Sequence, residues 1–337
     1  MKISLFIILF FSSLLLRAES KRDTLVNKAW RDTVRLQKAQ IIDLDENSTA
    51  LFFRPKPFQF AKNVPLDLYQ LGKTSFSKKN LPKLGAILAG TAVLIAFDQH
   101  ITDAAQQFGR YINLDPSHKF TRVEVFKVPV IDLPGNLNAA FYFIGEGWPS
   151  ILIAGGFYSY GLATNDYRAL QTTSQLAEMF FTLAITTQFL KRISGRESPF
   201  IAMGEGSGTP GGEWRPYPNP TYYQKNVSSL DAFPSGHMAT VMATITILSG
   251  NYPDNKYIKP VGYSLMGLLG YAMLNNGVHW ISDYPLAIAI GYTCGKIALS
   301  RGRQIIPKLS TDHGASSSLT PAYIGEGGIG LRYQATF

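Results

Sequence analysis

Six apolar stretches alternate with polar segments between residues 82 and 300. In the third stretch, polar residues recur at Gln175, Glu178 and Gln188, a spacing typical of a helix with one wet or partner-facing side. The pattern predicts an all-α domain over residues 82–300, a compact bundle of about six core helices. The predicted helices lie near 82–99, 139–163, 172–191, 237–250, 259–275 and 281–300.

The segments on either side of this domain show no sustained periodicity. Residues 19–81 are polar and charged apart from short apolar pieces such as 50–53, so we expect an extended N-terminal segment that drapes over the main body. From residue 301 to residue 337 the composition turns to Gly, Ser and Thr. This C-terminal tail could end in a strand over residues 328–337 or remain a simple tail.

The first eighteen residues resemble a targeting segment. Lys2 precedes an apolar run over residues 3–16, and Ala18 is a plausible last residue before cleavage. The run is short for a membrane span, so we predict a signal peptide over residues 1–18 and export to the periplasm or cell envelope. An uncleaved anchor is the alternative.

Charge limits the classes of binding partner, and the number of cysteines limits the possible cross-links. The net charge of +9 is spread along the chain, and no basic run is interleaved with aromatic residues, so nucleic acid is not expected. A basic balance fits a phosphorylated substrate or an anionic membrane surface. The single cysteine, Cys294, excludes an internal disulfide and lies in an apolar stretch, where we expect it to be packed in the core.

Two histidines lie in settings that suit chemistry. His279 and Asp283 are four residues apart, which on a helix places them on one face, where the carboxylate can orient the ring. His237 follows Ser235 and Gly236 at the start of an apolar run, and a helix start of this kind favours an anion, phosphate above all.

A group of cations precedes these two sites. Lys191, Arg192 and Arg196 fall within six residues at the end of the third apolar stretch. An anion cradle, an oriented histidine and a second histidine able to donate a proton suit phosphoryl transfer, in which positioning and charge stabilisation carry most of the catalysis.

These residues resemble the type 2 phosphatidic acid phosphatase superfamily, which also contains bacterial acid phosphatases and vanadium haloperoxidases. Its signature has three parts: Lys followed after six intervening residues by Arg-Pro, then Pro-Ser-Gly-His, then Ser-Arg followed after five residues by His and after three more by Asp. Here Lys191 and Pro199 match the first part, residues 234–237 the second, and His279 with Asp283 the third. The resemblance covers roughly residues 82–300 and implies an acid phosphatase or haloperoxidase-like helical fold.

The resemblance also implies a mechanism. His279 attacks phosphorus and becomes a phosphohistidine while Asp283 holds its tautomer, and His237 protonates the leaving oxygen. Lys191, the Ser235 hydroxyl and the Gly236 amide would hold the non-bridging oxygens. Neither a metal nor a cofactor is implied.

The chain departs from the family pattern at both phosphate-clamping arginines. The first falls on Ser198, and the Ser-Arg of the third part falls on Ala272 and Met273. Neither serine nor methionine replaces a bidentate guanidinium. Either other cations substitute for them or phosphate binds weakly, and the local candidates are Arg196, Arg192 and Arg215.

Two features leave alternatives open. The Gly- and Pro-rich loop between Pro199 and Pro234 is read either as a lid or recognition loop or as a surface excursion. Several apolar stretches are nearer fourteen than twenty residues, and the mean hydropathy is +0.02, so a helical globule outside the bilayer is favoured over a six-span protein, with interfacial helices as a further option.

The sequence therefore predicts a phosphatase acting on a phosphate monoester or on a lipid or isoprenoid (pyro)phosphate through a phosphohistidine. The alternative from another class is a non-catalytic binding or structural protein of the envelope that keeps the fold, which Ser198 and Met273 favour. A vanadate-dependent haloperoxidase is less favoured, because vanadate binding should suffer at least as much from the missing arginines.

Overall fold

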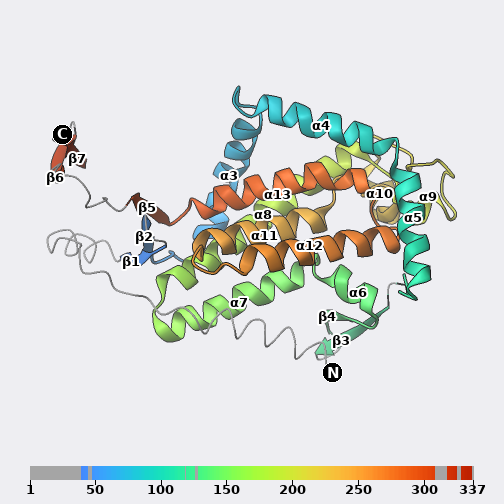
Figure 1. The fold of residues 1–337 in the computed structure, drawn as a ribbon, viewed down its shortest axis with the longest axis horizontal. Helices are drawn as coiled ribbons and strands as arrows, with labels where there is room; N and C mark the ends of the chain where they lie inside the picture. The colour runs from blue at the N-terminus through green and yellow to red at the C-terminus, as the bar shows by residue number, and fades with distance from the viewer. Residues whose placement is uncertain are drawn as a thin grey trace.

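The computed structural model describes residues 39–44, 48–117, 119–125, 128–307, 317–324 and 328–335. In this part of the chain helices predominate and small sheets lie at the periphery (Figure 1). The predicted all-α bundle is therefore confirmed, with strands added to it. The predicted signal peptide lies outside the described residues.

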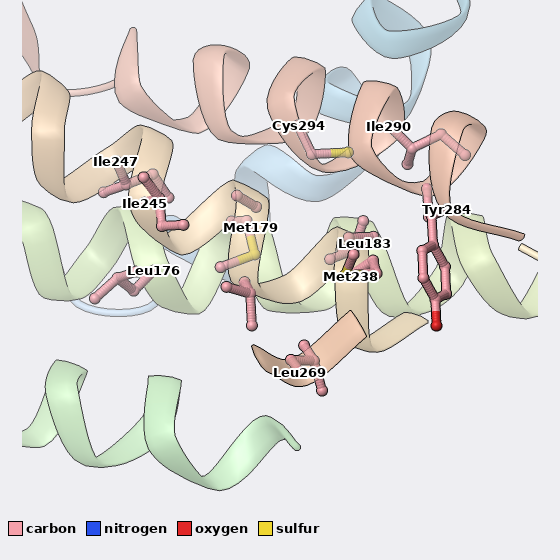
Figure 2. Packing of buried hydrophobic residues seen from close by; sticks show 14 of the residues in the cluster. Leu176, Met179, Leu183, Met238, Ile245, Ile247, Leu269, Tyr284, Ile290 and Cys294 are labelled. Atoms are coloured by element: carbon pink, nitrogen blue, oxygen red, sulfur yellow. The ribbon is translucent and has the colours of Figure 1, made fainter. Parts of the chain in front are cut away.

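Five long helices form the body of the bundle: α7 (Gly147–Thr164), α8 (Tyr167–Ser194), α11 (Gly236–Asn251), α12 (Ile258–Asn275) and α13 (Tyr284–Leu299). Leu176 and Met179 of α8, Ile247 of α11 and Cys294 of α13 are buried together in its core (Figure 2). Helices α11 and α13 approach so closely that a Cβ at Gly291 would lie 2.2 Å from the carbonyl oxygen of Ala239. Burial of these side chains is the main force that holds the bundle together.

The four predicted helices that correspond to α8, α11, α12 and α13 agree with the structure to within about one turn, since their apolar faces all turn toward one core. The stretch over 281–300 begins with a short 3₁₀ turn, η2 (Ile281–Asp283), before α13 starts.

Two predicted helices are each divided. The stretch over 82–99 ends as α4 (Leu81–Ile95), and the chain then bends by 66° into α5 (Asp98–Tyr111), which turns Asp98 into the interior. The stretch over 139–163 is interrupted between α6 (Leu137–Phe143) and α7. A Cβ at Gly145 would lie 2.6 Å from Cβ of His237, so the break brings the backbone against that histidine.

The prediction of an extended N-terminal segment over residues 19–81 is only partly right, because it contains the helix α3 (Gln59–Ser75). Helix α3 buries Val64, Asp67 and Leu71. Its internal Pro65 and its mixture of apolar and polar residues make this helix difficult to recognise from the sequence. The strands β1 (Ala39–Asp43) and β2 (Ser48–Phe53) are extended, as expected.

Strands occur in three places. Strand β5 (Arg303–Pro307) completes an antiparallel sheet of order β1-β2-β5 at the end of the bundle away from α9 and α10 (Figure 1). A hairpin of β3 (Phe120–Val125) and β4 (Val128–Pro134) connects α5 to α6. In the tail, β6 (Ser317–Ile324) pairs with β7 (Gly328–Ala335), so of the two alternatives for the tail the strand is the one observed.

The loop predicted between Pro199 and Pro234 has local structure of its own. It contains α9 (Pro199–Ala202), α10 (Pro220–Lys225) and the 3₁₀ turn η1 (Val227–Ser229). Arg196, which precedes it, forms isolated β-bridges with Trp214 and Asp231, and these fasten the loop to the end of α8.

Helix α4 is the least covered helix of the bundle. It is apolar almost throughout, yet Thr91 is its only buried residue. In the part of the chain that the structure describes, no single helix combines the length and apolar composition of a membrane span. Helices α4 and α5 meet both criteria only when taken together across their bend.

Candidate functional site

The site begins at the N-terminus of α11. Ser235 is its N-cap, and its hydroxyl oxygen accepts a hydrogen bond from the Met238 amide at 3.4 Å. A Cβ at Gly236 would meet nothing within 4 Å, so there is open space beside the first residue of this helix. Open space beside a helix start, where the first backbone amides have no partner within the helix, can accept an anion.

His279 is reached through a tight turn after α12. Gly277 has a φ of 73°, a conformation that favours glycine, and the Phe200 amide at the start of α9 donates to its carbonyl at 2.7 Å. His279 Nδ1 lies 3.3 Å from Oδ2 of Asp283, so the predicted pair is in contact. The pair does not lie on an α-helix as the spacing suggested, because residues 281–283 form the 3₁₀ turn η2.

Asp283 also holds the turn itself. The Trp280 amide donates to the same Oδ2 at 2.8 Å. The same carboxylate oxygen therefore caps the turn and contacts the histidine.

The structure brings the two predicted catalytic histidines together. The ring centroids of His237 and His279 are 5.7 Å apart, in an edge-on arrangement. His279 is 2% exposed and His237 is half-buried, so His237 lies nearer to solvent. The ring of Tyr142, from α6, lies 4.6 Å from that of His237. Burial raises the pKa of Tyr142, and the carboxylates Glu146 and Asp231 act in the same direction, so the phenol stays neutral.

Lys191 and Asp231 form an ion pair at this end of the bundle. Lys191 Nζ lies 3.1 Å from Oδ2 of Asp231, and their side chains are 9% and 26% exposed. The lysine that the sequence assigned to phosphate therefore already has a carboxylate partner, which offsets its charge.

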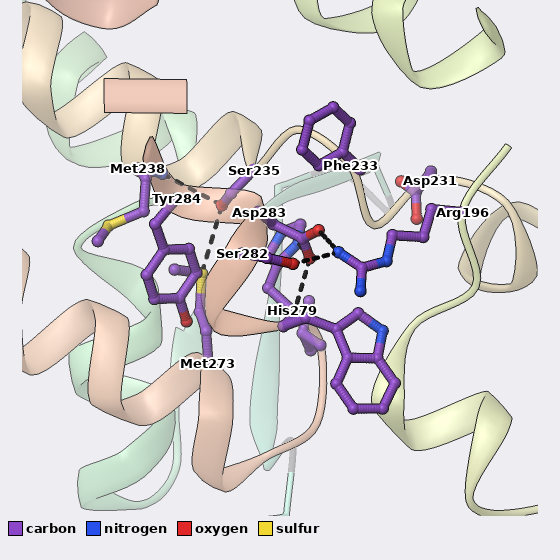
Figure 3. A network of polar contacts seen from close by, with 12 residues as sticks. Arg196, Asp231, Phe233, Ser235, Met238, Met273, His279, Ser282, Asp283 and Tyr284 are labelled. Atoms are coloured by element: carbon purple, nitrogen blue, oxygen red, sulfur yellow. Dashed lines mark hydrogen bonds and ion pairs between the residues drawn. The ribbon is translucent and has the colours of Figure 1, made fainter. Parts of the chain in front are cut away.

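Arg196 occupies a buried network behind Asp283 (Figure 3). Its Nη1 donates to Oδ1 of Asp283 at 2.6 Å, and its Nη2 donates to Oδ2 of Asp98 at 2.5 Å. The side chain is fully buried. These contacts do not fit the phosphate clamp that the sequence suggested, because the guanidinium is already bound to two carboxylates.

The other candidate arginines are also engaged. Arg215 donates to Glu213 at 2.5 Å and to the Tyr222 hydroxyl at 3.2 Å, and Arg192 binds Gln188. The positions where the family has arginines are buried as well, and Sδ of Met273 lies 3.8 Å from the Ser235 hydroxyl. One wall of the anion cradle is thus apolar.

Sequence reasoning missed four residues of the site: Asp98, Tyr142, Glu146 and Asp231. Burial raises the pKa of Asp98, whereas the Arg196 charge and the Ser282 hydrogen bonds oppose that shift. Burial and the nearby Asp132 raise the pKa of Glu146. The only sequence signal for any of them is that Asp231 lies four residues before Ser235. In the residues that the structure describes, no cluster of three or more His, Cys, Asp or Glu side chains is arranged to hold a metal ion.

A comparison with protein families covers the segment that carries this geometry. Residues 172–305 match the PAP2 superfamily. This segment includes Lys191, Ser235, His237, His279 and Asp283, and the match confirms the resemblance seen in the sequence. It supports a phosphatase in general terms. Helices α3 to α7 precede the matched segment, so Asp98, Tyr142 and Glu146 come from outside it.

One solved structure is similar, the crystal structure of the first transmembrane PAP2 type phosphatidylglycerolphosphate phosphatase from Bacillus subtilis. The TM-score is 0.34 at 14% identity, over 72% of this chain and 94% of that one. A likeness this low does not constrain the substrate. No curated protein matches the chain.

Proposed function

We propose that this protein is a phosphatase that hydrolyses a phosphate monoester, or a lipid or isoprenoid (pyro)phosphate, through a phosphohistidine at His279. The observation that carries the proposal is the contact set of three side chains. Asp283 lies 3.3 Å from Nδ1 of His279, and the ring of His237 lies 5.7 Å from that of His279 beside the open start of α11.

In the first step, Nε2 of His279 attacks phosphorus while the bond to the ester oxygen breaks and takes its electron pair to the leaving group. His237 gives a proton to that oxygen. Asp283 accepts the hydrogen bond from Nδ1, which leaves Nε2 as the nucleophile and stabilises the positive ring of the intermediate.

In the second step, water attacks the phosphohistidine. His237 takes the proton from this water, and the nitrogen–phosphorus bond breaks to return its electron pair to Nε2. Phosphate then leaves and the site is restored. The start of α11, with the amides of Gly236 and the residues after it, would hold the non-bridging oxygens.

Lys191 is the one unsubstituted cation of the family's clamp, and Asp231 offsets it at 3.1 Å. We therefore expect weak binding of the phosphoryl group and a larger share of substrate affinity from the rest of the molecule. An apolar substrate with an isoprenoid or acyl chain meets this requirement better than a small sugar phosphate.

The test is phosphate release by residues 19–337, measured on p-nitrophenyl phosphate, phosphatidic acid and undecaprenyl pyrophosphate. His279→Ala should abolish release while thermal unfolding shows an intact fold. His100→Ala removes an exposed histidine on α5 and is the matched control, expected to keep full activity. Equal release by wild type and His279→Ala would refute the proposal.

The acid role of His237 has its own test. His237→Ala should lower turnover of poor leaving groups more than that of p-nitrophenyl phosphate, because nitrophenolate needs little protonation. Equal losses on both kinds of substrate would contradict this role.

A non-catalytic binding protein of the envelope is the second candidate. The buried Met273 and the carboxylate partners of Arg196 and Lys191 favour it. Vanadate separates the candidates when combined with the release assay. Protection against thermal unfolding without turnover would point to a binder.

We also propose that the protein is exported and lies against an anionic membrane surface through α4. Its exposed apolar side chains include Leu88 and Val93, and the exposed Lys78, Lys79 and Lys83 lie around its first turn. An apolar helix face beside lysines fits the interface of a bilayer with anionic lipids.

Co-sedimentation with vesicles that contain phosphatidylglycerol tests this association. Leu88→Asp with Val93→Asp should lower binding, whereas Tyr257→Asp, at an exposed tyrosine before α12, should not. Equal binding by both variants, or equal binding to neutral vesicles, would contradict it.

A further inference from the structure

The guanidinium of Arg196 is fully buried, and it contacts Asp283, the carboxylate that orients His279. Arg196 follows Gly195, which ends α8 with a φ of 55°, and this turn directs the chain behind Asp283 instead of toward the open start of α11. The rings of Trp214 and Trp280 lie 4.6 Å and 5.6 Å from its central carbon. These aromatic neighbours restrict the position of the guanidinium.

Both oxygens of Asp283 are consequently held. Oδ1 accepts from Arg196, and Oδ2 accepts from the Trp280 amide while it contacts His279. A carboxylate bonded on both oxygens cannot rotate without breaking one of these contacts. The direction in which the His279 ring points is therefore tied to Arg196.

Arg196 is in turn held from outside the segment that matches the family. Asp98, the first residue of α5, accepts from Nη2 of Arg196, from the Ser282 hydroxyl at 2.5 Å and from the Ser282 amide at 3.0 Å. Ser282 also accepts from Nη1 of Arg196 at 2.6 Å. Asp98, Arg196 and Asp283 thus form a line of hydrogen-bonded side chains. Ser282, the residue next to Asp283, bonds both Asp98 and Arg196 and completes a ring of contacts.

We propose that Arg196, anchored by Asp98, is a positioning residue that fixes Asp283 and through it the nucleophilic ring of His279. The inference rests on the proposed function, since it takes His279 as the nucleophile. It replaces the phosphate clamp expected from the sequence by a role behind the catalytic pair. Asp283, with Oδ2 against Nδ1 of His279, would also stabilise the positive form of the ring after phosphoryl transfer.

Steady-state kinetics of Arg196→Lys test the role. Lysine keeps the charge but cannot bind Asp98, Ser282 and Asp283 together, so kcat should fall about 10- to 100-fold while KM changes less than about 2-fold. Asp98→Asn keeps the shape of its side chain and should lower kcat in the same direction by less. If Arg196→Lys fails to fold, Asp98→Asn carries the test.

Arg301→Lys is the matched control. Arg301 is another substantially buried arginine paired to an aspartate, Asp67, but it lies at the opposite end of α13. We expect Arg301→Lys to lower the unfolding temperature and leave kcat unchanged. A fall in kcat equal to that of Arg196→Lys would show that Arg196 acts through general stability and would overturn the proposal. A rise in KM at unchanged kcat in Arg196→Lys would also overturn it, because it would mean direct contact with phosphate.

A spectroscopic signature makes the test independent of turnover. In wild type labelled with ¹⁵N-histidine, the Nδ1 proton of His279 should resonate far downfield, assigned by its loss in His279→Gln. In Arg196→Lys and Asp98→Asn this signal should move upfield or disappear by exchange. An unchanged signal in both variants would overturn the positioning role. A wild type that releases no phosphate from any substrate would defeat the proposed function alone, and the signal would still report on the orientation of His279.

Discussion

Two arginine clusters at opposite ends of α13 solve the same electrostatic problem differently. Arg196 contacts Asp98 and Asp283 just before the helix, and Arg301, just after it, contacts Asp67 at 2.5 Å and Glu178 at 3.7 Å. Each cluster therefore places two carboxylates around one guanidinium in the interior, where an uncompensated charge is costly.

The clusters differ in how the second carboxylate is satisfied. Around Arg196, Ser282 and the Trp280 amide supply further donors. Around Arg301, Oδ2 of Asp67 and Oε1 of Glu178 receive no hydrogen bond from an amide, hydroxyl or guanidinium group of the described residues. Burial raises the pKa of Glu178 to about 9, and the neighbouring Asp67 adds to the shift, so Glu178 is protonated at neutral pH. In the Arg301 cluster a proton therefore compensates the second carboxylate, whereas in the Arg196 cluster hydroxyl and amide donors do so.

This difference has a functional meaning. A cluster neutralised by a proton changes its charge with pH, whereas one satisfied by hydroxyl and amide donors keeps a charged carboxylate in a fixed direction. The end of α13 that carries the histidines has the second arrangement. The comparison can be tested from both sides, beginning with the largest expected effect.

Asp283→Asn should disrupt the Arg196 cluster and lower the catalytic rate. The amide cannot accept from Arg196 and His279 in the same way, so kcat should fall about a thousandfold while the helical signal in circular dichroism is retained. Asp254→Asn is the control, since that carboxylate is half-exposed and lies 3.9 Å from Arg168. Wild-type kcat in Asp283→Asn would contradict the role of the network.

Arg301→Met should disrupt the Arg301 cluster and lower stability without changing kcat. Removal of one partner leaves Asp67 buried with its charge unpaired, so the free energy of unfolding should fall by about 3 kcal/mol at unchanged kcat. Urea unfolding measures it. The double variant Arg301→Met with Asp67→Asn should recover part of the loss, and a double variant as unstable as the single one would argue against a charge effect.

Glu178→Gln should change how the stability of the fold depends on pH. Because the pKa of Glu178 rises from 4.5 unfolded to about 9 folded, the folded state holds a proton that the unfolded state releases. Wild-type stability should therefore fall as pH rises from about 5 to about 9, and Glu178→Gln should show a flatter slope. Unfolding temperatures across this range measure the effect, and parallel curves would contradict a protonated Glu178.

The smallest expected effect concerns the ion pair at the site. Asp231→Asn should release the charge of Lys191 for the substrate and lower KM by up to about 5-fold, a range set by the modest energy of partly exposed pairs. The same variant should bind vanadate more tightly. An increased KM would mean that Asp231 itself contributes to substrate binding.

Much of the fold and the chemical core of the site could be predicted from the sequence. The apolar periodicity located α8, α11, α12 and α13, and the short-range spacing of His279 with Asp283 identified a pair that is in contact. These signals are local, and local patterns are what a single sequence carries best. The role of His279 as a nucleophile stays a prediction.

The features that were missed depend on distant parts of the chain. Asp98 and Arg196 are 98 residues apart, so their ion pair cannot be predicted from a short-range spacing in the sequence. The break at Gly145 is understood only from the position of His237, and α3 is recognisable only from the surface of α8 that it covers. Arg196 was assigned to phosphate because its neighbours in sequence are cations, whereas its neighbours in space are carboxylates.

The origin of Asp67 and Asp98 has a consequence for how the protein can be divided. Both aspartates precede residue 172, where the family match begins, and each neutralises an arginine that lies within it. A fragment cut at that boundary would keep His237 and His279 and lose one of the two carboxyl partners of each of these interior arginines. The smallest fragment that folds, and that could be transferred to another protein as a module, is therefore longer than residues 172–305. It must include Asp67 and Asp98.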